Sequence, residues 1–321
     1  MEFGFLLTLF NPGVLFFMLG LFAVYVNSNL EIPESIVKFL TLYLMMAIGF
    51  KGGVSLAVTP LIGSSFVAIG VVLLMSAIVP IYTFYLLRKR FGIYDAAAIG
   101  ATYGSNSTLT YITAAAFLTS IGVAYGGYMT VALVLMETPA IIFSILLARR
   151  AEHNKNVSTW NLTKQAMKDG TFITLLGSMI IGFLLVVMGN DTNILITFIA
   201  GDMFTGLLIF FLIYMGIHVG KKMKQLDQFD WRLVVYAIIA PIFNGLIAVA
   251  FAVIFSIPAG SAFLLVILCA SASYIVAPAL LKDAMPEANA AKYLTMSMAI
   301  TFPLNIVIGI PAYWWLLGIL L

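Results

Sequence analysis

A polar segment interrupts a long apolar stretch in the first half of the chain. Residues 94–119 are mostly apolar, but their middle reads Gly104, Ser105, Asn106, Ser107 and Thr108. A helix that crosses a bilayer must satisfy its own backbone hydrogen bonds, so such a break is tolerated only where it is buried in protein or lines a cavity. A half-helix that begins at this break would offer unbonded N–H groups and the positive end of its dipole, which together bind small anions.

A second polar segment interrupts the apolar residues 263–281 in the second half. We expect another half-helix to begin in this segment, which consists of Ser271, Ala272, Ser273, Tyr274 and Ile275. Interrupted helices in corresponding halves of a chain indicate the substrate site of a transporter. We therefore predict that residues 104–108 and 272–275 meet near the middle of the membrane and bind a small planar anion. The alternative interpretation is that these small polar residues only hold helices together.

Glu137 is the acidic residue most securely inside a predicted membrane span, about ten residues into the apolar stretch 127–147. A carboxylate inside a bilayer is costly, and such residues usually serve function. We predict that a coupling cation binds there, with oxygen ligands from Glu137, Asn106, Ser273 and Asn305. Two alternatives stay open: Glu137 as a protonated structural acid, and Asn305 as an amide that satisfies a carbonyl freed by Pro303.

The composition is that of a polytopic membrane protein. Hydrophobic residues make up 63% and charged residues 9% of the chain, whereas a soluble domain carries about 25% charged residues. The single cysteine, Cys269, excludes an internal disulfide, and two histidines are too few for a metal cluster with cysteine partners. The sequence has no phosphate-binding glycine loop and no catalytic acid pair. We expect no enzyme, no nucleic-acid partner and no cofactor besides a sodium ion.

Ten apolar stretches approach the roughly 20 residues that a helix needs to cross a bilayer. They divide the chain into a first half of five helices (1–147), a cytoplasmic linker (148–170) and a second half of five helices (171–321). The ten stretches are 3–26, 36–53, 61–87, 94–119, 127–147, 172–189, 193–219, 231–257, 261–281 and 290–320.

The two halves carry the same motifs in the same order, as expected of an internal repeat. Residues 49–53 and 216–220 both read Gly-x-x-x-Gly, Pro80 corresponds to Pro241, and the two polar segments correspond to each other. Because five is an odd number, the second copy must enter the membrane from the opposite side. The sequence predicts an all-α membrane protein with ten transmembrane helices in two inverted five-helix repeats, whose broken helices 4 and 9 cross at mid-membrane.

The lysine and arginine residues are distributed unequally between the two sides. Basic residues cluster after the third, fifth, seventh and ninth helices, and the opposite side holds only Lys51. Because cytoplasmic loops carry the excess, we expect a multi-pass protein of the cell (inner) membrane with both termini extracytoplasmic. We interpret Lys51 as a residue whose stem lies along the membrane while its charge reaches the surface.

The motifs and the repeat resemble the sodium-dependent bicarbonate permease family (SbtA-like transporters) over nearly the whole chain. The resemblance is carried by residues 49–53, 104–108, 137–140, 236–241, 271–278 and 286–293. The family implies ten helices in core and gate subdomains, a homotrimer, sodium-coupled bicarbonate uptake by an elevator-like motion, and inhibition by a cytoplasmic PII-like protein.

Three features depart from the family pattern. Tyr274 stands where an aspartate is expected, Glu137 replaces a second aspartate, and the linker 148–170 is shorter. The coupling ion therefore stays open between sodium and a proton, and the regulatory partner stays open as well. The competing functions are a proton-coupled or uncoupled transporter of small carboxylates, and a membrane anion sensor that acts through a cytoplasmic partner.

Overall fold

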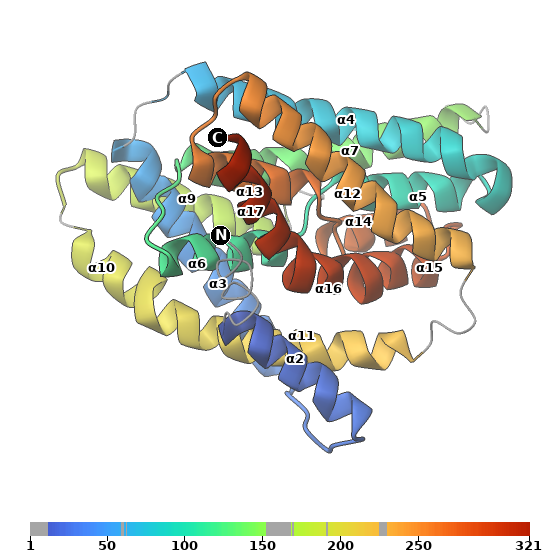
Figure 1. Cartoon of the computed structure of the whole chain (residues 1–321), viewed down its shortest axis with the longest axis horizontal. Coiled ribbons are helices and arrows are strands. Elements are labelled where there is room, and N and C mark those ends of the chain that lie inside the picture. The colour runs from blue at the N-terminus through green and yellow to red at the C-terminus, as the bar shows by residue number, and fades with distance from the viewer. Residues whose placement is uncertain are drawn as a thin grey trace.

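The computed structural model describes residues 12–58, 61, 63–151, 168, 170–190, 192–224 and 230–321. Within them every regular element is a helix and no strand is present (Figure 1). The start of the first predicted stretch and most of the predicted linker 148–170 lie outside the described residues. The predicted all-α class is confirmed.

Helices occupy all ten predicted stretches. Among the described residues, six helices or joined helices are long and apolar enough to cross a membrane, and three shorter apolar helices accompany them. The elements are α2 (Pro12–Tyr25), α3 (Glu34–Val58), α4 (Gly63–Phe91), α5 (Ile93–Gly104), α6 (Thr108–Ser120), α7 (Tyr128–Ala151), α9 (Gly170–Val187), α10 (Asn193–Thr197), η1 (Phe198–Asp202), α11 (Met203–Met223), α12 (Trp231–Ile254), α13 (Ala259–Cys269), α14 (Val276–Ala284), α15 (Ala290–Leu294), η3 (Thr295–Thr301), α16 (Phe302–Leu304), η4 (Asn305–Gly309) and α17 (Ile310–Leu320).

The helices form two groups, and both halves of the chain contribute to each. In the first group, α3 packs along α9, and α11 packs along α2 and α3. In the second group, α4 packs with α5 and α7, while α12 and α17 pack with α13. Figure 1 shows α2 and α11 on one side of the molecule and α4 and α12 on the other. Each group therefore combines helices that lie far apart in the sequence.

Glycines let the helices of the first group approach one another closely. A Cβ atom at Gly49 would collide with the backbone of Leu175 in α9, and one at Gly216 would collide with the backbone of Phe17 in α2. Backbones this close gain van der Waals contact along both helices, which is a common way to join helices inside a membrane. The two Gly-x-x-x-Gly motifs thus perform the same packing task in α3 and in α11.

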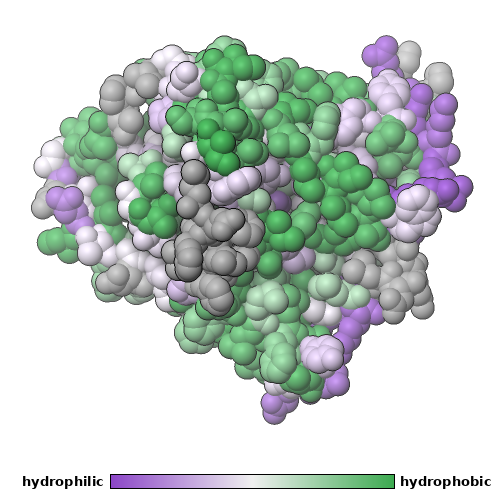
Figure 2. Space-filling view, viewed as in Figure 1, coloured by the Kyte–Doolittle hydropathy of each residue, from purple (hydrophilic) through white to green (hydrophobic). Residues whose placement is uncertain are grey.

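The visible face of the molecule is largely apolar, and charged residues gather at one end. Figure 2 shows a broad hydrophobic surface with hydrophilic residues concentrated at its right side. The basic last turns of α4, α7 and α11 lie at this end, with Arg88, Lys89, Arg90, Arg149, Arg150, Lys221 and Lys222. An apolar belt with one strongly basic end is the surface expected of a protein that lies in a bilayer.

We expect the substitution Gly49→Val to destabilise the protein in detergent, because the larger side chain must push α9 away from α3. Overpacking of this kind typically costs about 1–3 kcal/mol. Gly70→Val in α4 is the matched control, since a Cβ atom at Gly70 meets nothing within 4 Å. Thermal unfolding followed by intrinsic fluorescence measures both variants. Equal melting temperatures would show that the close contact between α3 and α9 is not needed.

Candidate functional site

The first predicted break separates α5 from α6. α5 ends at Gly104, where Pro80 of α4 leaves no room for a side chain. After an extended segment, α6 begins at Thr108. Ser107 caps α6, because its side-chain oxygen accepts a hydrogen bond from the amide of Thr110 at 3.2 Å, as serine commonly does at a helix start. The break follows directly from this local sequence.

The second predicted break separates α13 from α14. α13 ends at Cys269, and α14 begins at Val276. The side-chain oxygen of Ser273 accepts a hydrogen bond from the amide of Ala277 at 3.1 Å. A serine therefore satisfies one of the N–H groups that every helix start leaves unbonded. Each half-helix is thus preceded by a serine whose side-chain oxygen accepts a hydrogen bond from an amide of that helix.

Two hydrogen bonds join the breaks to each other. The amide of Ser107 donates to the side-chain oxygen of Ser271 at 2.9 Å, and the amide of Ser273 donates to the carbonyl of Thr102 at 2.8 Å. All four residues are buried. Backbone groups that one break frees are thus satisfied by the other break, and the two segments are held side by side.

A cavity of about 10 Å³ lies where the two half-helices begin. The N–H groups of Leu109, Tyr274 and Ile275 make no backbone hydrogen bond with any described residue. They lie at the positive ends of two helix dipoles, which suit an anion. A volume near 10 Å³ admits about one water molecule, so the cavity is closed to a larger anion in this conformation. It is lined by Met45, Asn106, Ser107, Thr108, Leu109, Ser273, Tyr274, Ile275 and Val276.

Six of the nine residues that the sequence predicts to bind substrate line this cavity. The other three, Gly104, Ser105 and Ala272, are buried beside the breaks but do not line it. Met45, which belongs to α3, also lines the cavity. The sequence does not predict Met45, because an apolar residue inside a membrane span carries no signal for a binding site.

Glu137 of α7 lies next to the first break. The hydroxyl of Thr108 donates a hydrogen bond to its carboxylate at 3.5 Å. The side-chain amide of Asn106 donates to the carbonyl of Leu133, one turn earlier in α7, at 2.9 Å. The side-chain oxygen of Asn106 is buried and has no hydrogen-bond partner among the described residues. A carboxylate, a hydroxyl and an unpaired amide oxygen in one buried place are hard oxygen ligands of the kind that a small cation prefers.

The other predicted cation ligands are differently placed. The side-chain amide of Asn305 donates to the carbonyl of Ala270 at 2.7 Å, where α13 ends. Ser273 uses its side-chain oxygen to cap α14. In the part of the chain that the structure describes, no three His, Cys, Asp or Glu side chains form a cluster. A cation at the breaks would therefore depend on Glu137 together with neutral oxygen atoms.

The chain has the features of a membrane transporter: apolar helices long enough to span a bilayer, and two broken helices that meet at one buried place. The family model described as the Na+-dependent bicarbonate transporter superfamily matches residues 12–318. The chain therefore belongs to this superfamily, as its motifs predict. A comparison with curated proteins finds no match.

We expect Ser271→Ala to lower the stability of the protein, because the amide of Ser107 would stay buried without an acceptor. An unsatisfied buried donor costs about 1–3 kcal/mol. Ser35→Ala, at an exposed position of α3, is the matched control and should melt like the parent protein. Thermal unfolding in detergent measures both variants. An unchanged melting temperature for Ser271→Ala would contradict a stabilising role for the bond between the breaks.

Proposed function

We propose that the chain takes up bicarbonate by sodium symport across the cell (inner) membrane. The observation that carries this proposal is the pair of broken helices whose starting residues share one buried cavity. Two positive helix ends favour a small anion without any basic side chain, and unbonded N–H groups suit a planar oxyanion. Membership of the superfamily supports bicarbonate as the anion and sodium as the coupling ion.

The helices in this proposal form two inverted five-helix repeats, residues 1–147 and 171–321, joined by the linker 148–170. Two sets of corresponding contacts support it. α3 packs along α9 while α11 packs along α2, and each pairing uses its own Gly-x-x-x-Gly motif. After each break, a serine side chain accepts a hydrogen bond from an amide in the first turn of the half-helix. In both helix pairs, the first helix of one half packs against the second helix of the other half. A two-fold axis in the membrane plane produces this arrangement.

Transport requires the cavity at the breaks to open, because a volume of about 10 Å³ does not hold bicarbonate. The breaks belong to the second helix group, whereas Met45, which also lines the cavity, belongs to α3 of the first group. A displacement of the second group past the first would carry the breaks away from Met45. This is an elevator-type movement, in which one helix group carries the site past the other.

The basic ends of α4, α7 and α11 face the cytoplasm in this proposal, which makes both termini extracytoplasmic. The resemblance to the family adds a homotrimer and a PII-like protein that binds the basic face. Lys221 already pairs with Glu31 at 3.1 Å, while Lys89 and Arg90 are exposed. The end of α4 is therefore the better-placed part of this face for an acidic partner.

Purified protein in proteoliposomes should accumulate bicarbonate when an inward sodium gradient is present. An anion that enters an inside-negative compartment works against about 2.3 kcal/mol per charge and 100 mV, so its accumulation needs a cation. Isotope uptake at fixed pH across a sodium titration measures this, with small carboxylates as comparison substrates. Uptake that ignores sodium and follows the proton gradient would establish the proton-coupled alternative. Binding without flux would establish a sensor.

Glu137→Gln should reduce sodium-driven uptake by roughly tenfold or more, the effect of losing about 1.4 kcal/mol of cation binding. The amide keeps the size of the side chain but removes the negative charge that the cation needs. Glu31→Gln, at an exposed acid in a surface ion pair, is the matched control and should transport normally. A fully active Glu137→Gln protein would exclude Glu137 as the site of either sodium or a proton.

A further inference from the structure

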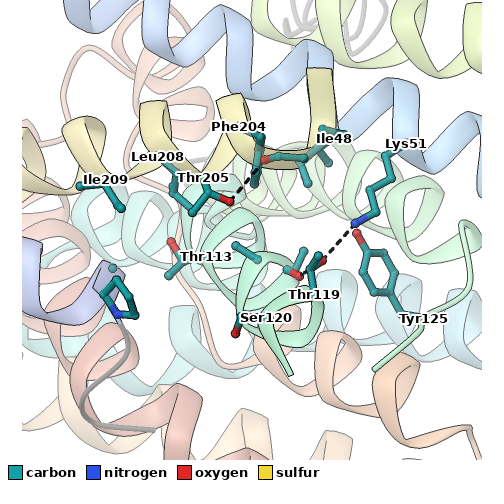
Figure 3. Close-up of a pocket in the computed structure, with 16 residues that line it drawn as sticks. Ile48, Lys51, Thr113, Thr119, Ser120, Tyr125, Phe204, Thr205, Leu208 and Ile209 are labelled. Carbon is teal, nitrogen blue, oxygen red and sulfur yellow. Dashed lines mark hydrogen bonds between the residues drawn. The ribbon is translucent and has the colours of Figure 1, made fainter. Parts of the chain in front are cut away.

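The side chain of Lys51 contacts two other segments of the chain. Its ammonium group reaches across to α6 and donates a hydrogen bond to the hydroxyl of Thr119 at 3.0 Å. It also lies 5.7 Å from the centre of the Tyr125 ring, and Figure 3 shows the side chain directed into a pocket. Lys51 takes part in none of the ion pairs found among the described residues. An ammonium group has three donors, so two are left for a ligand.

The pocket is a cavity of about 200 Å³ that is lined mainly by residues of α2, α3, α6, η1 and α11. Thr113, Thr119 and Ser120 of α6 form one wall, and residues of α3 and α11 form others (Figure 3). Each of these three hydroxyls now donates to a carbonyl of its own helix, but a hydroxyl hydrogen rotates to suit a new partner. None of the described residues that line the cavity is acidic, and Lys51 is the charged one among them. Such a site attracts an anion and repels a cation.

Two helices, α3 and α6, contribute residues to both the large cavity and the small cavity at the breaks. On α6, Leu109 lines the small cavity at the breaks, and Thr113 lines the large cavity one turn further on. On α3, Met45 lines the small cavity, and Ile48 lines the large one about one turn further on. Thr119, which holds the ammonium group, lies about 15 Å beyond Leu109 at the rise of an α-helix. On each helix, the residue that lines the small cavity therefore comes first, and the residue that lines the large cavity follows about one turn later.

The large cavity lies away from the basic end of the molecule. α6 ends at the left of Figure 1, whereas the basic last turns of α4, α7 and α11 lie at the right. In the proposed orientation, the left end faces the outside of the cell. An imported anion arrives from this side.

We propose that the large cavity is an outer binding site for small oxyanions such as bicarbonate, in which Lys51 attracts the anion before it reaches the helix breaks. The movement of the anion from this site to the breaks rests on the proposed function, whereas the preference of the cavity for anions does not. A purely structural role for Lys51 is the competing explanation, because its charge also complements the negative C-terminal end of α6. The two roles predict different responses to charged probes and to salt.

A thiol at the cavity tests the charge preference directly. Ser120→Cys places it among the lining residues without removing the partner of Lys51, and the native Cys269 is buried, so the parent protein provides the background. The ratio of labelling rates for an anionic and a cationic methanethiosulfonate should fall roughly tenfold when Lys51→Met is added. A change in the reactivity of the thiol affects both reagents equally, so it leaves the ratio of their labelling rates unchanged. Lys51→Arg should keep the preference, and bicarbonate should slow the anionic reagent.

Transport kinetics provide the second measurement. In proteoliposomes, Lys51→Met should raise the KM for bicarbonate by roughly tenfold at low ionic strength and leave the maximal rate unchanged. The difference should shrink when choline gluconate is added at constant sodium, because salt screens the attraction. Lys51→Arg should behave like the parent protein.

Several results would overturn the outer site. A labelling ratio that is the same with and without Lys51 would do so, and so would an active Lys51→Met protein with an unchanged KM. A lower maximal rate with a KM that ignores salt would assign Lys51 a structural role instead. If the parent protein moves no bicarbonate at all, the proposed function fails, while the labelling ratio still decides whether the cavity selects anions.

Discussion

Inside a bilayer, every backbone N–H and C=O group that a broken helix frees must find another partner, and the rest of the structure depends on how this constraint is met. Each break supplies hydrogen-bond partners for backbone groups of the other break. The amide of Ser107 uses the hydroxyl of Ser271, and the amide of Ser273 uses the carbonyl of Thr102. The amides of Leu109, Tyr274 and Ile275 make no backbone hydrogen bond with any described residue, and these three residues line one cavity. Two helices can therefore be broken at little cost while their positive ends are kept for an anion.

α3 connects the packing of the first helix group to both cavities. Gly49 lets α3 lie close against α9, Met45 lines the cavity at the breaks, and Lys51 bonds across to α6. These three residues lie within two turns of one helix. A shift of α6 relative to α3 would change the closure of the small cavity and the position of the ammonium group together. If the proposed outer site and the proposed opening of the breaks both exist, α3 is the element that connects them.

The sequence predicts the helices and both breaks because these depend on local composition: polar residues beside a glycine cannot continue a lipid-facing helix. Contacts between distant segments leave no such local signal. The place of Met45 in the cavity lining and the contact of Lys51 with α6 both follow from where α3 packs, and the sequence of the span predicts neither. The packing of Tyr274 is another contact between distant segments that the sequence does not predict. The sequence suggests a lost cation ligand there, but its ring packs edge-on against Phe302 with the centroids 5.3 Å apart.

The arrangement of charges at the first break gives a physical reason for coupling. Thr108 lines the cavity and also donates a hydrogen bond to Glu137, so an ionised carboxylate would lie one hydroxyl group away from a bound anion. Two negative charges in a buried place repel each other strongly, because little water screens them. A sodium ion between Asn106 and Glu137, or a proton on Glu137, removes this repulsion. Lys51 of α3 bonds to Thr119 of α6, which lies about 15 Å beyond Leu109 at the rise of an α-helix, and in the proposed outer site its charge favours an anion over a cation. In the proposed mechanism, the requirement for a cation therefore arises at the break itself, and the outer cavity sets only how readily the anion arrives.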